Sequence, residues 1–191
     1  VTPVGSYFKS GHKSLNTIVT DKYHRVATKS IGFAKAVGNY AGTLLPYKEI
    51  VEDGYDEIIF LNSSNENIID EARSANIFVL KDHVLKTPGL QGSILPGITR
   101  DSVIKVATKL FNLDVREEDV SLDELMNADE VFFTGTAAVI VPVGRIVYKN
   151  NKTKFKINYE ESVTKKIRER LIDIQYENIE DPFDWVIPLE K

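Results

Sequence analysis

Apolar runs of two kinds alternate along this chain, and this alternation limits its possible folds more than any other feature. Short runs with a period of two residues are typical of β-strands, whereas apolar residues three and four positions apart are typical of amphipathic helices. The strand-like runs are 14–20, 56–62, a meander of three between 67 and 86, 130–135, 137–143 and a hairpin over 144–155. The strands and helices do not follow the strict βαβ alternation of a doubly wound sheet. We therefore predict one α/β domain, in which a mixed sheet is flanked by helices.

Four segments carry the helical period. They are a segment that begins near 34 and runs to 52, and the ranges 99–111, 121–127 and 159–175. In the first, we expect a kink at Pro46 and an end at Gly54. Its apolar face is expected to be core, with Val37, Ala41, Leu44 and Leu45. In the second, Thr99 is the expected N-terminal cap.

The composition excludes several classes of function. Of 191 residues, 42% are hydrophobic and 27% charged, as in ordinary globular proteins. The net charge of -4, with basic residues scattered among acidic ones, predicts no nucleic-acid partner. The absence of cysteine excludes disulfides and a cysteine nucleophile, and the three histidines lie far apart, so we expect no metal. No apolar run reaches about eighteen residues, so we expect a cytoplasmic protein without a membrane partner.

Lys35 stands beside an apolar helical pattern in the stretch AKAVGNYAGTLL, residues 34–45. Burying an ammonium group costs free energy unless its charge is paired. One interpretation is therefore that Lys35 extends into solvent as an ordinary surface charge, and the residues alone favour it. The other interpretation is that the chain surrounds this amine with a site in which it reacts.

Glu71 is a second residue with two interpretations. It follows the apolar pair Ile68 and Ile69 and precedes another strand-like run. A partly buried carboxylate at this place can pair with a cationic ring nitrogen, whereas a carboxylate at the end of a strand is more often a surface charge. Taken alone, the residues favour the surface interpretation.

Two turns rich in small residues can bind an anion. In GSILPGITRDS, residues 92–102, a loop leads directly into a helix, so the N–H groups of Ile98 and Thr99 and the Thr99 hydroxyl can form a cradle. Ordinary helix capping explains this loop equally well. In FFTGTAAV, residues 132–139, Gly135 permits close approach of the backbone and Thr136 supplies a hydroxyl.

Four blocks resemble one known family when they are taken together in their order and spacing. They are KAVGNYAGTLL, DEARSANIFV, GSILPGITRDSV and DEVFFTGTAAVIVPVG. They are similar to the branched-chain amino acid aminotransferases, which are pyridoxal-phosphate (PLP) enzymes of fold type IV. The resemblance covers nearly the whole chain and ends with DPFDWVIPL. It implies the large-domain fold of that family, PLP as the cofactor, and amino-group exchange between leucine, isoleucine or valine and 2-oxoglutarate.

The resemblance also implies a role for each matching position. Lys35 matches the lysine that forms the aldimine with the cofactor and then moves the substrate proton as general base and acid. Tyr40 matches the tyrosine that hydrogen-bonds the phenolic oxygen of the cofactor, and Glu71 matches the carboxylate beside the pyridine nitrogen. The other cofactor contacts are Leu95 against the ring and, for the phosphate, Ile98, Thr99, Gly135 and Thr136. The backbone turn expected to receive the substrate carboxylate is Gly135, Thr136 and Ala137.

The chain departs from the family pattern in two places near this expected pocket. The stretch RVATKSIG, residues 25–32, lacks a proline and two glycines that relatives often have there, and it adds Lys29. Arg73 stands where a glycine is common, and an inward Arg73 would form a salt bridge with Glu71. We expect these changes to alter cofactor affinity or substrate preference.

The domain organisation is a further implication of the resemblance. Family members carry an N-terminal small domain that supplies a phosphate-binding arginine and pairs with a second subunit. Residues 1–14 are therefore expected to be an interdomain linker remnant, and residues 15–191 the large PLP-binding domain of a longer, homodimeric polypeptide from which the small domain is missing. One alternative is a D-amino acid aminotransferase or aminodeoxychorismate lyase of the same fold, although GNY after the lysine differs from those relatives. Another is a PLP-binding remnant without turnover.

Overall fold

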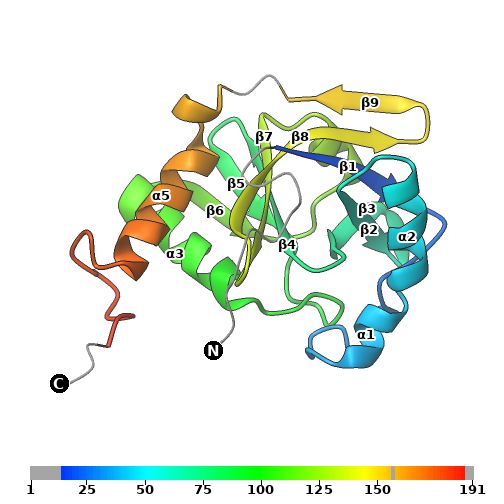
Figure 1. Ribbon diagram of the computed structural model, residues 1–191, viewed down its shortest axis with the longest axis horizontal. Helices are drawn as coiled ribbons and strands as arrows, with labels where there is room; N and C mark the ends of the chain where they lie inside the picture. Colours follow the sequence, from blue (N-terminus) through cyan, green and yellow to red (C-terminus); the bar gives the residue numbers. More distant parts are fainter. Residues whose placement is uncertain (1–13, 156–157, 188–191) are drawn as a thin grey trace.

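The computed structural model describes residues 14–155 and 158–187, so the expected linker remnant, 1–14, lies outside the described residues except for its last position (Figure 1). The strands are β1 (Leu15–Thr20), β2 (Glu57–Asn62), β3 (Asn65–Ala72), β4 (Asn76–Lys81), β5 (Val84–Thr87), β6 (Asp114–Glu117), β7 (Glu130–Gly135), β8 (Val139–Tyr148) and β9 (Asn151–Lys154). The helices are α1 (Val37–Ala41), α2 (Leu44–Glu52), α3 (Ile98–Phe111), α4 (Leu122–Met126), the short 3-10 helix η1 (Tyr159–Glu161) and α5 (Val163–Gln175).

The nine strands of the described residues form one mixed sheet. Its order is β3-β2-β1-β8-β7-β4-β5-β6, with β9 paired to β8. The pairs β1–β2, β1–β8 and β5–β6 are parallel, and the other neighbours are antiparallel. β8 changes neighbours along its length, because its first half pairs with β7 and its second half with β1 and β9. The predicted α/β class, a mixed sheet with flanking helices, is confirmed.

Helices cover the sheet at two places (Figure 1). α3 and α5 pack against each other and against β7 and β8, over an apolar cluster that contains the stacked rings of Phe78 and Phe132. α2 packs on β2 at the other end of the molecule, where Ile50 meets Ile58 and Phe60. A third and larger cluster joins the central strands to α4. The three clusters hold the strand ends that surround the candidate site in fixed positions.

The predicted helix over 34–52 is wrong in its shape, because the chain forms two helices there. The break falls at Gly42 and Thr43, where the Thr43 N–H and hydroxyl both donate to the Tyr40 carbonyl, at 3.0 and 2.7 Å. Pro46 does not kink a helix. It is the third residue of α2, in the first turn, where its missing N–H leaves no helical hydrogen bond unmade.

The core prediction for this segment is also wrong. Val37, Leu44 and Leu45 are 85%, 63% and 58% exposed, and Ala41 is exposed as well. The inward positions are instead those of Asn39, Pro46 and Ile50. The Asn39 amide satisfies its buried hydrogen-bonding groups by donating to the carbonyls of Ile31 and Ala34, at 2.8 and 2.9 Å. Val37 and Ala41 lie on α1 and Leu44 and Leu45 on α2, so these residues do not form the single buried helical face that the spacing predicts.

Two strands differ from their predictions. β8 is one strand through Gly144, where we expected a strand over 137–143 followed by a hairpin over 144–155. The hairpin turn lies between Tyr148 and Asn151, beyond Gly144. β6 was not predicted, because the sequence DVRE of 114–117 carries charges along a mostly exposed edge strand.

Candidate active site

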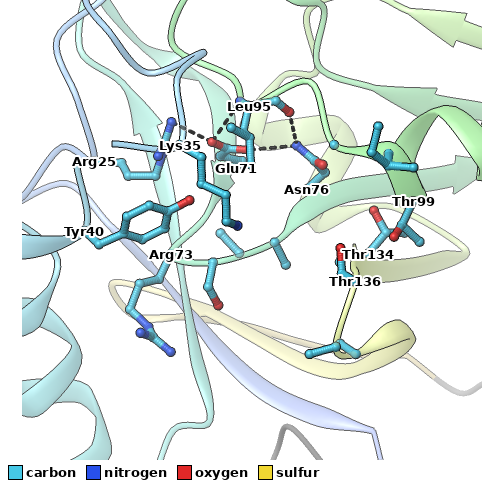
Figure 2. A pocket seen from close by; sticks show the side chains of 18 residues that line it. Arg25, Lys35, Tyr40, Glu71, Arg73, Asn76, Leu95, Thr99, Thr134 and Thr136 are labelled. Carbon is cyan, nitrogen blue, oxygen red and sulfur yellow. Dashed lines mark hydrogen bonds and ion pairs between the residues drawn. The ribbon is translucent and has the colours of Figure 1, made fainter. Parts of the chain in front are cut away.

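One cavity of about 330 Å³ brings together every residue to which the resemblance assigns a role (Figure 2). These residues are Lys35, Tyr40, Glu71, Leu95, Ile98, Thr99, Gly135, Thr136 and Ala137. They come from four segments far apart in sequence: the entry to α1, the end of β3, the loop into α3, and the turn between β7 and β8. Arg25, Asn76 and Thr134 also line the cavity, although the sequence assigned them no role.

Lys35 lies two residues before α1, and its side chain extends toward the cavity (Figure 2). Its Nζ is 5.7 Å from the centre of the Tyr40 ring, within the usual range of a cation–π contact. Among the described residues, no carboxylate forms an ion pair with this amine. Lys35 as a whole is exposed, as the surface interpretation expects, but its amine faces the cavity wall that also holds Glu71 and Thr99.

Glu71 is buried, so its interpretation as a surface charge is wrong. Its side chain is 4% exposed, and its Oε1 lies 2.6 Å from Nη2 of Arg25. Two further donors reach the carboxylate, the Leu95 N–H at 3.2 Å and the Asn76 amide at 2.8 Å. Burial raises the pKa of Glu71 to about 8, while Arg25 and these two donors act in the opposite direction.

Arg25 is the functional neighbour that the sequence did not reveal. Its side chain is 2% exposed, and besides Glu71 it binds the carbonyl oxygens of Gly32 and Ser93. It therefore ties the loop over 25–32 to the loop over 89–95, which enters α3. Arg25 is the first residue of RVATKSIG, and its neighbours in the sequence give no sign that it is buried. Its partners Glu71 and Ser93 are distant in the sequence, and Gly32 approaches it only because the loop over 25–32 turns back.

Arg73 does not form the salt bridge with Glu71 that an inward arginine would make. Its Nε lies 3.6 Å from Oε1 of Glu57, and its guanidinium stacks on the Tyr47 ring at 3.9 Å. Glu57 is completely buried on the neighbouring strand β2, and burial raises its pKa while Arg73 opposes that rise. Glu71 is paired with Arg25 instead, so Arg73 does not compete for the carboxylate of the cavity.

The N-terminus of α3 forms one side of the cavity. Gly97 is the N-cap, and no side chain makes a capping hydrogen bond, so the prediction that Thr99 caps the helix is wrong. Thr99 is instead the second helical residue. The N–H groups of Ile98 and Thr99 precede the first intrahelical hydrogen bond, which the Asp101 N–H makes to Gly97. These donors, at the positive end of a helix of 14 residues, suit an anion.

The turn between β7 and β8 lies beside this helix end. Figure 2 shows Thr99, Thr134 and Thr136 on one side of the cavity, with Tyr40 and Arg25 on the other. Thr136 and Ala137 are exposed, and Gly135 is half-buried. The cavity is therefore polar at two separate places, with a buried ion pair at one and backbone N–H groups and hydroxyls at the other.

This arrangement suits an elongated ligand with an anionic group and a basic ring nitrogen. The anionic group would meet the N-terminus of α3, and the nitrogen would meet the Glu71 carboxylate. The amine of Lys35 is available to a reactive carbon between them. Among residues 14–155 and 158–187, no group of three or more histidine or acidic side chains has the arrangement of a metal site.

Comparisons with known proteins identify a family for this chain. The family model described as amino-transferase class IV matches residues 5–146. The chain is 40% identical over 189 residues to branched-chain-amino-acid aminotransferase 3, chloroplastic, of Arabidopsis thaliana, which covers 99% of this chain and 46% of that protein. The chain thus spans about half the length of the curated relatives it matches.

Solved structures share the fold. The branched-chain aminotransferase of the archaeon Thermoproteus uzoniensis with norvaline is 34% identical, with a TM-score of 0.82 over 98% of this chain and 59% of that one. The enzyme of Thermobaculum terrenum in its PLP (holo) form is 28% identical, with a TM-score of 0.79 over 93% of this chain and 55% of that one. Because the family model spans most of the chain and the structures superpose over nearly all of it, this chain belongs to the class IV aminotransferase family.

Proposed function

We propose that this chain is the large, cofactor-binding part of a PLP-dependent aminotransferase that exchanges the amino group between leucine, isoleucine or valine and 2-oxoglutarate. The observation that carries the proposal is the meeting, in one cavity, of the Lys35 amine, the buried Glu71 carboxylate and the uncapped N-terminus of α3. The relatives named as branched-chain aminotransferases support the choice of substrate.

The residues present fit PLP at each of its polar groups. A phosphate needs several donors, and the helix N-terminus with Ile98 and Thr99 offers them. A protonated ring nitrogen needs a carboxylate, and Glu71 is held for this purpose by three donors. When bound, PLP would supply an electron sink for the electron pair left when an amino acid loses its α-proton.

Glu71 would hold a proton at the ring nitrogen. Arg25, the Leu95 N–H and the Asn76 amide favour the ionised carboxylate, which is the form that would pair with a protonated ring nitrogen, and they oppose the rise in the pKa of Glu71 that burial causes. Arg25 would keep the carboxylate oriented toward the cavity, because its guanidinium is itself fixed by the carbonyls of Gly32 and Ser93.

Lys35 would attach the cofactor and move the substrate proton. Its amine lines the cavity and can act as a base that takes the α-proton from the amino acid substrate. The protonated amine can then act as the acid that gives a proton back in the reverse half of the exchange. The Tyr40 hydroxyl would donate to the phenolic oxygen of the cofactor, and Leu95 would pack against its ring. Thr99 and Thr136, with the Ile98 N–H, would anchor the phosphate, so that motion is confined to the reacting end.

The turn over 135–137 would receive the carboxylate of the substrate. Gly135 allows the backbone to approach closely, and Thr136 and Ala137 are exposed at the cavity. The two alternatives keep this cavity but change its use. A D-amino acid aminotransferase or an aminodeoxychorismate lyase would act on other substrates, and a remnant would bind PLP without turnover.

The test is covalent attachment at Lys35. Borohydride reduction of the protein with PLP should fix the cofactor to the peptide that contains Lys35, and Lys35→Ala should abolish this labelling. Lys48→Ala is the matched control, because Lys48 is an exposed lysine on α2 outside the cavity. Formation of glutamate from leucine and 2-oxoglutarate should also require Lys35. Labelling without turnover would favour the remnant, and turnover of D-alanine would favour the D-amino acid alternative.

The surroundings of the domain are part of the proposal. We propose that residues 15–191 act with a small domain and that the protein is a homodimer, because several apolar side chains near the cavity are exposed in the isolated domain. We propose the cytoplasm as the compartment, although several relatives are named as chloroplastic and others as mitochondrial. In the described part of the chain, none of the helices has both the length and the apolar character that crossing a membrane requires. Fractionation of cells that express the full protein tests the compartment.

A further inference from the structure

The Thr134 hydroxyl is a buried polar group without a hydrogen-bond partner among the described residues. Thr134 is 0% exposed. It is the last residue but one of β7 and stands next to Gly135. Buried hydroxyls are nearly always hydrogen-bonded, because an unmade bond leaves the full cost of desolvation uncompensated. The other buried threonines whose bonds are known follow this rule, as when Thr87 donates to the Ile77 carbonyl at 2.8 Å.

The unpartnered hydroxyl belongs to the wall of the cavity. Thr134 pairs with Asn76 across β7 and β4, so the two side chains lie on the same face of the sheet. Asn76 uses its amide to bind Glu71 and the Leu95 carbonyl, both at 2.8 Å, and so reaches toward the ring end of the cavity. Thr134 lies with Thr99 and Thr136 on the other side (Figure 2).

The helix end beside Thr134 is unsatisfied in the same way. α3 has no side-chain cap, and its first N–H groups at Ile98 and Thr99 have no intrahelical acceptor. The acidic residue of its first turn, Asp101, is exposed and bound to Lys105 at 2.7 Å, so it does not fill the cradle. The Thr134 hydroxyl and the first N–H groups of α3 therefore lie on the same side of the cavity, and both lack a hydrogen-bond acceptor among the described residues. These two observations are independent.

We propose that the Thr134 hydroxyl is a further phosphate-binding group, which donates to a phosphate oxygen held at the N-terminus of α3. The proposal rests on the proposed function and deepens it, because it adds a residue that neither the sequence nor the family resemblance singled out. A phosphate monoester suits the place better than a carboxylate, since its three terminal oxygens can accept from the helix N–H groups and from more than one hydroxyl.

The hydroxyl then has a distinctive signature. Thr134→Val keeps the shape of the side chain and removes a group that has no partner in the cofactor-free protein. The variant without cofactor should therefore melt no lower than the wild type, yet bind PLP about tenfold or more weakly, because a hydrogen bond to a charged oxygen is lost. Binding of pyridoxal, which lacks the phosphate, should not change. Thr134→Ser, which keeps the hydroxyl, should bind PLP nearly as the wild type does.

Thr87→Val is the matched control. Its hydroxyl is buried but already bonded, and Thr87 does not line the cavity. This variant should melt at a lower temperature than the wild type and keep the same ratio of PLP to pyridoxal affinity. If Thr134 had a purely structural role, Thr134→Val would behave like Thr87→Val: its melting temperature would fall and its ratio of PLP to pyridoxal affinity would not change.

The experiment measures the dissociation constants of PLP and pyridoxal, and the rise in melting temperature caused by inorganic phosphate, for all four proteins. A wild-type ratio and a wild-type response to phosphate in Thr134→Val would overturn the proposal. If phosphate binding depends on Thr134 but PLP never attaches to Lys35, the phosphate site stands and the proposed aminotransferase function fails. If the wild type binds neither phosphate nor PLP, both are wrong.

Discussion

Arg25 and Glu71 are both held away from water, and each makes the burial of the other tolerable. Two buried charges in contact are roughly balanced between their desolvation and their attraction, whereas one buried charge alone is strongly unfavourable. Nη2 of Arg25 also donates to the carbonyl oxygens of Gly32 and Ser93, whereas its buried Nε has no hydrogen-bond partner among the described residues. The pair therefore stabilises the shape of the cavity wall more than it stabilises the fold.

We predict that Arg25→Met, measured above pH 8 where Glu71 is ionised, lowers the free energy of unfolding by about 3 to 5 kcal/mol, because it leaves this carboxylate buried without its cation. Replacing both residues by methionine should recover part of this loss. Denaturant unfolding measures both effects. The control is Arg116→Met, whose pair with Asp114 has the same 2.6 Å distance but is about half exposed, and whose loss should cost about 1 kcal/mol or less. Equal losses at the two sites would contradict the role of burial.

The pKa of Glu71 predicts a dependence of stability on pH. Its ordinary value is 4.5 and burial raises it to about 8, so between these values the folded chain binds a proton that the unfolded chain releases. The contribution to stability is therefore fully present below pH 4.5 and is lost as the pH rises toward 8. Glu71→Gln should remove this slope.

The measurement is the free energy of unfolding of Glu71→Gln and of the wild type at several pH values between 4.5 and 8. The difference between the two should move in favour of the variant as the pH rises. The comparison isolates Glu71 from Glu57 and Asp70, whose pKa values are also raised by burial but which both proteins share. A difference that does not change with pH would show that the pKa of Glu71 is not raised.

At the scale of elements, the loop over 25–32 and the loop over 89–95 approach each other closely. The Phe33 N–H donates to the Gly92 carbonyl at 3.1 Å, and a Cβ on Gly32 would collide with the backbone of Ser93. Backbone atoms cannot move aside as the end of a flexible side chain can. The contact holds the loop over 25–32, which carries Arg25, against the loop that leads into α3.

We predict that Gly32→Ala destabilises the domain by about 1 to 3 kcal/mol, because the methyl group forces the two loops apart. It should also weaken PLP binding, since Arg25 would shift from Glu71. Gly38→Ala is the control: an added Cβ there meets nothing within 4 Å, and alanine favours helix α1. Thermal melting measures the stability of the two variants, and titration with PLP measures their affinity for the cofactor. If both variants had the same stability and the same affinity, the close approach of the two loops would be contradicted.

Predictions of elements from the sequence were correct where hydrophobic period and capping agree. The segment over 99–111 became α3 within one residue, and 56–62 and 130–135 became β2 and β7. They were wrong where a neighbour decides the outcome. The edge strand β6 exists because β5 offers it a partner, and its own residues, DVRE, carry no apolar alternation.

At the scale of the whole molecule, several apolar side chains of α1, α2 and the loop before them are not covered by the described residues. Val37, Leu44 and Leu45 are largely exposed, together with Ile31 and Phe33. Five exposed large apolar side chains within residues 31–45 are typical of a surface that another protein segment covers. Val37 stands in the sequence between Lys35 and Tyr40, which both line the cavity.

On the basis of the proposed homodimer, we predict that Val37→Glu and Leu44→Glu weaken self-association without lowering the free energy of unfolding of the monomer, because both side chains are exposed in it. Sedimentation equilibrium over a range of concentrations measures the first effect and denaturant unfolding the second. Tyr176→Glu is the control, since Tyr176 is 75% exposed just after α5, at the other end of the molecule (Figure 1). An unchanged dimer in both variants would place the subunit interface elsewhere.

The sequence alone determined the α/β class and the order of most elements, because these follow from local hydrophobic period. Through the family resemblance it also singled out Lys35 and Glu71. Only the tertiary structure decided that Glu71 is buried, that Arg25 rather than Arg73 is its partner, and that the Thr134 hydroxyl has no hydrogen-bond partner among the described residues. The physical reason is that burial and charge pairing depend on which segments meet in space, and Arg25 meets Glu71 across 46 residues of chain that carry no local sign of the contact.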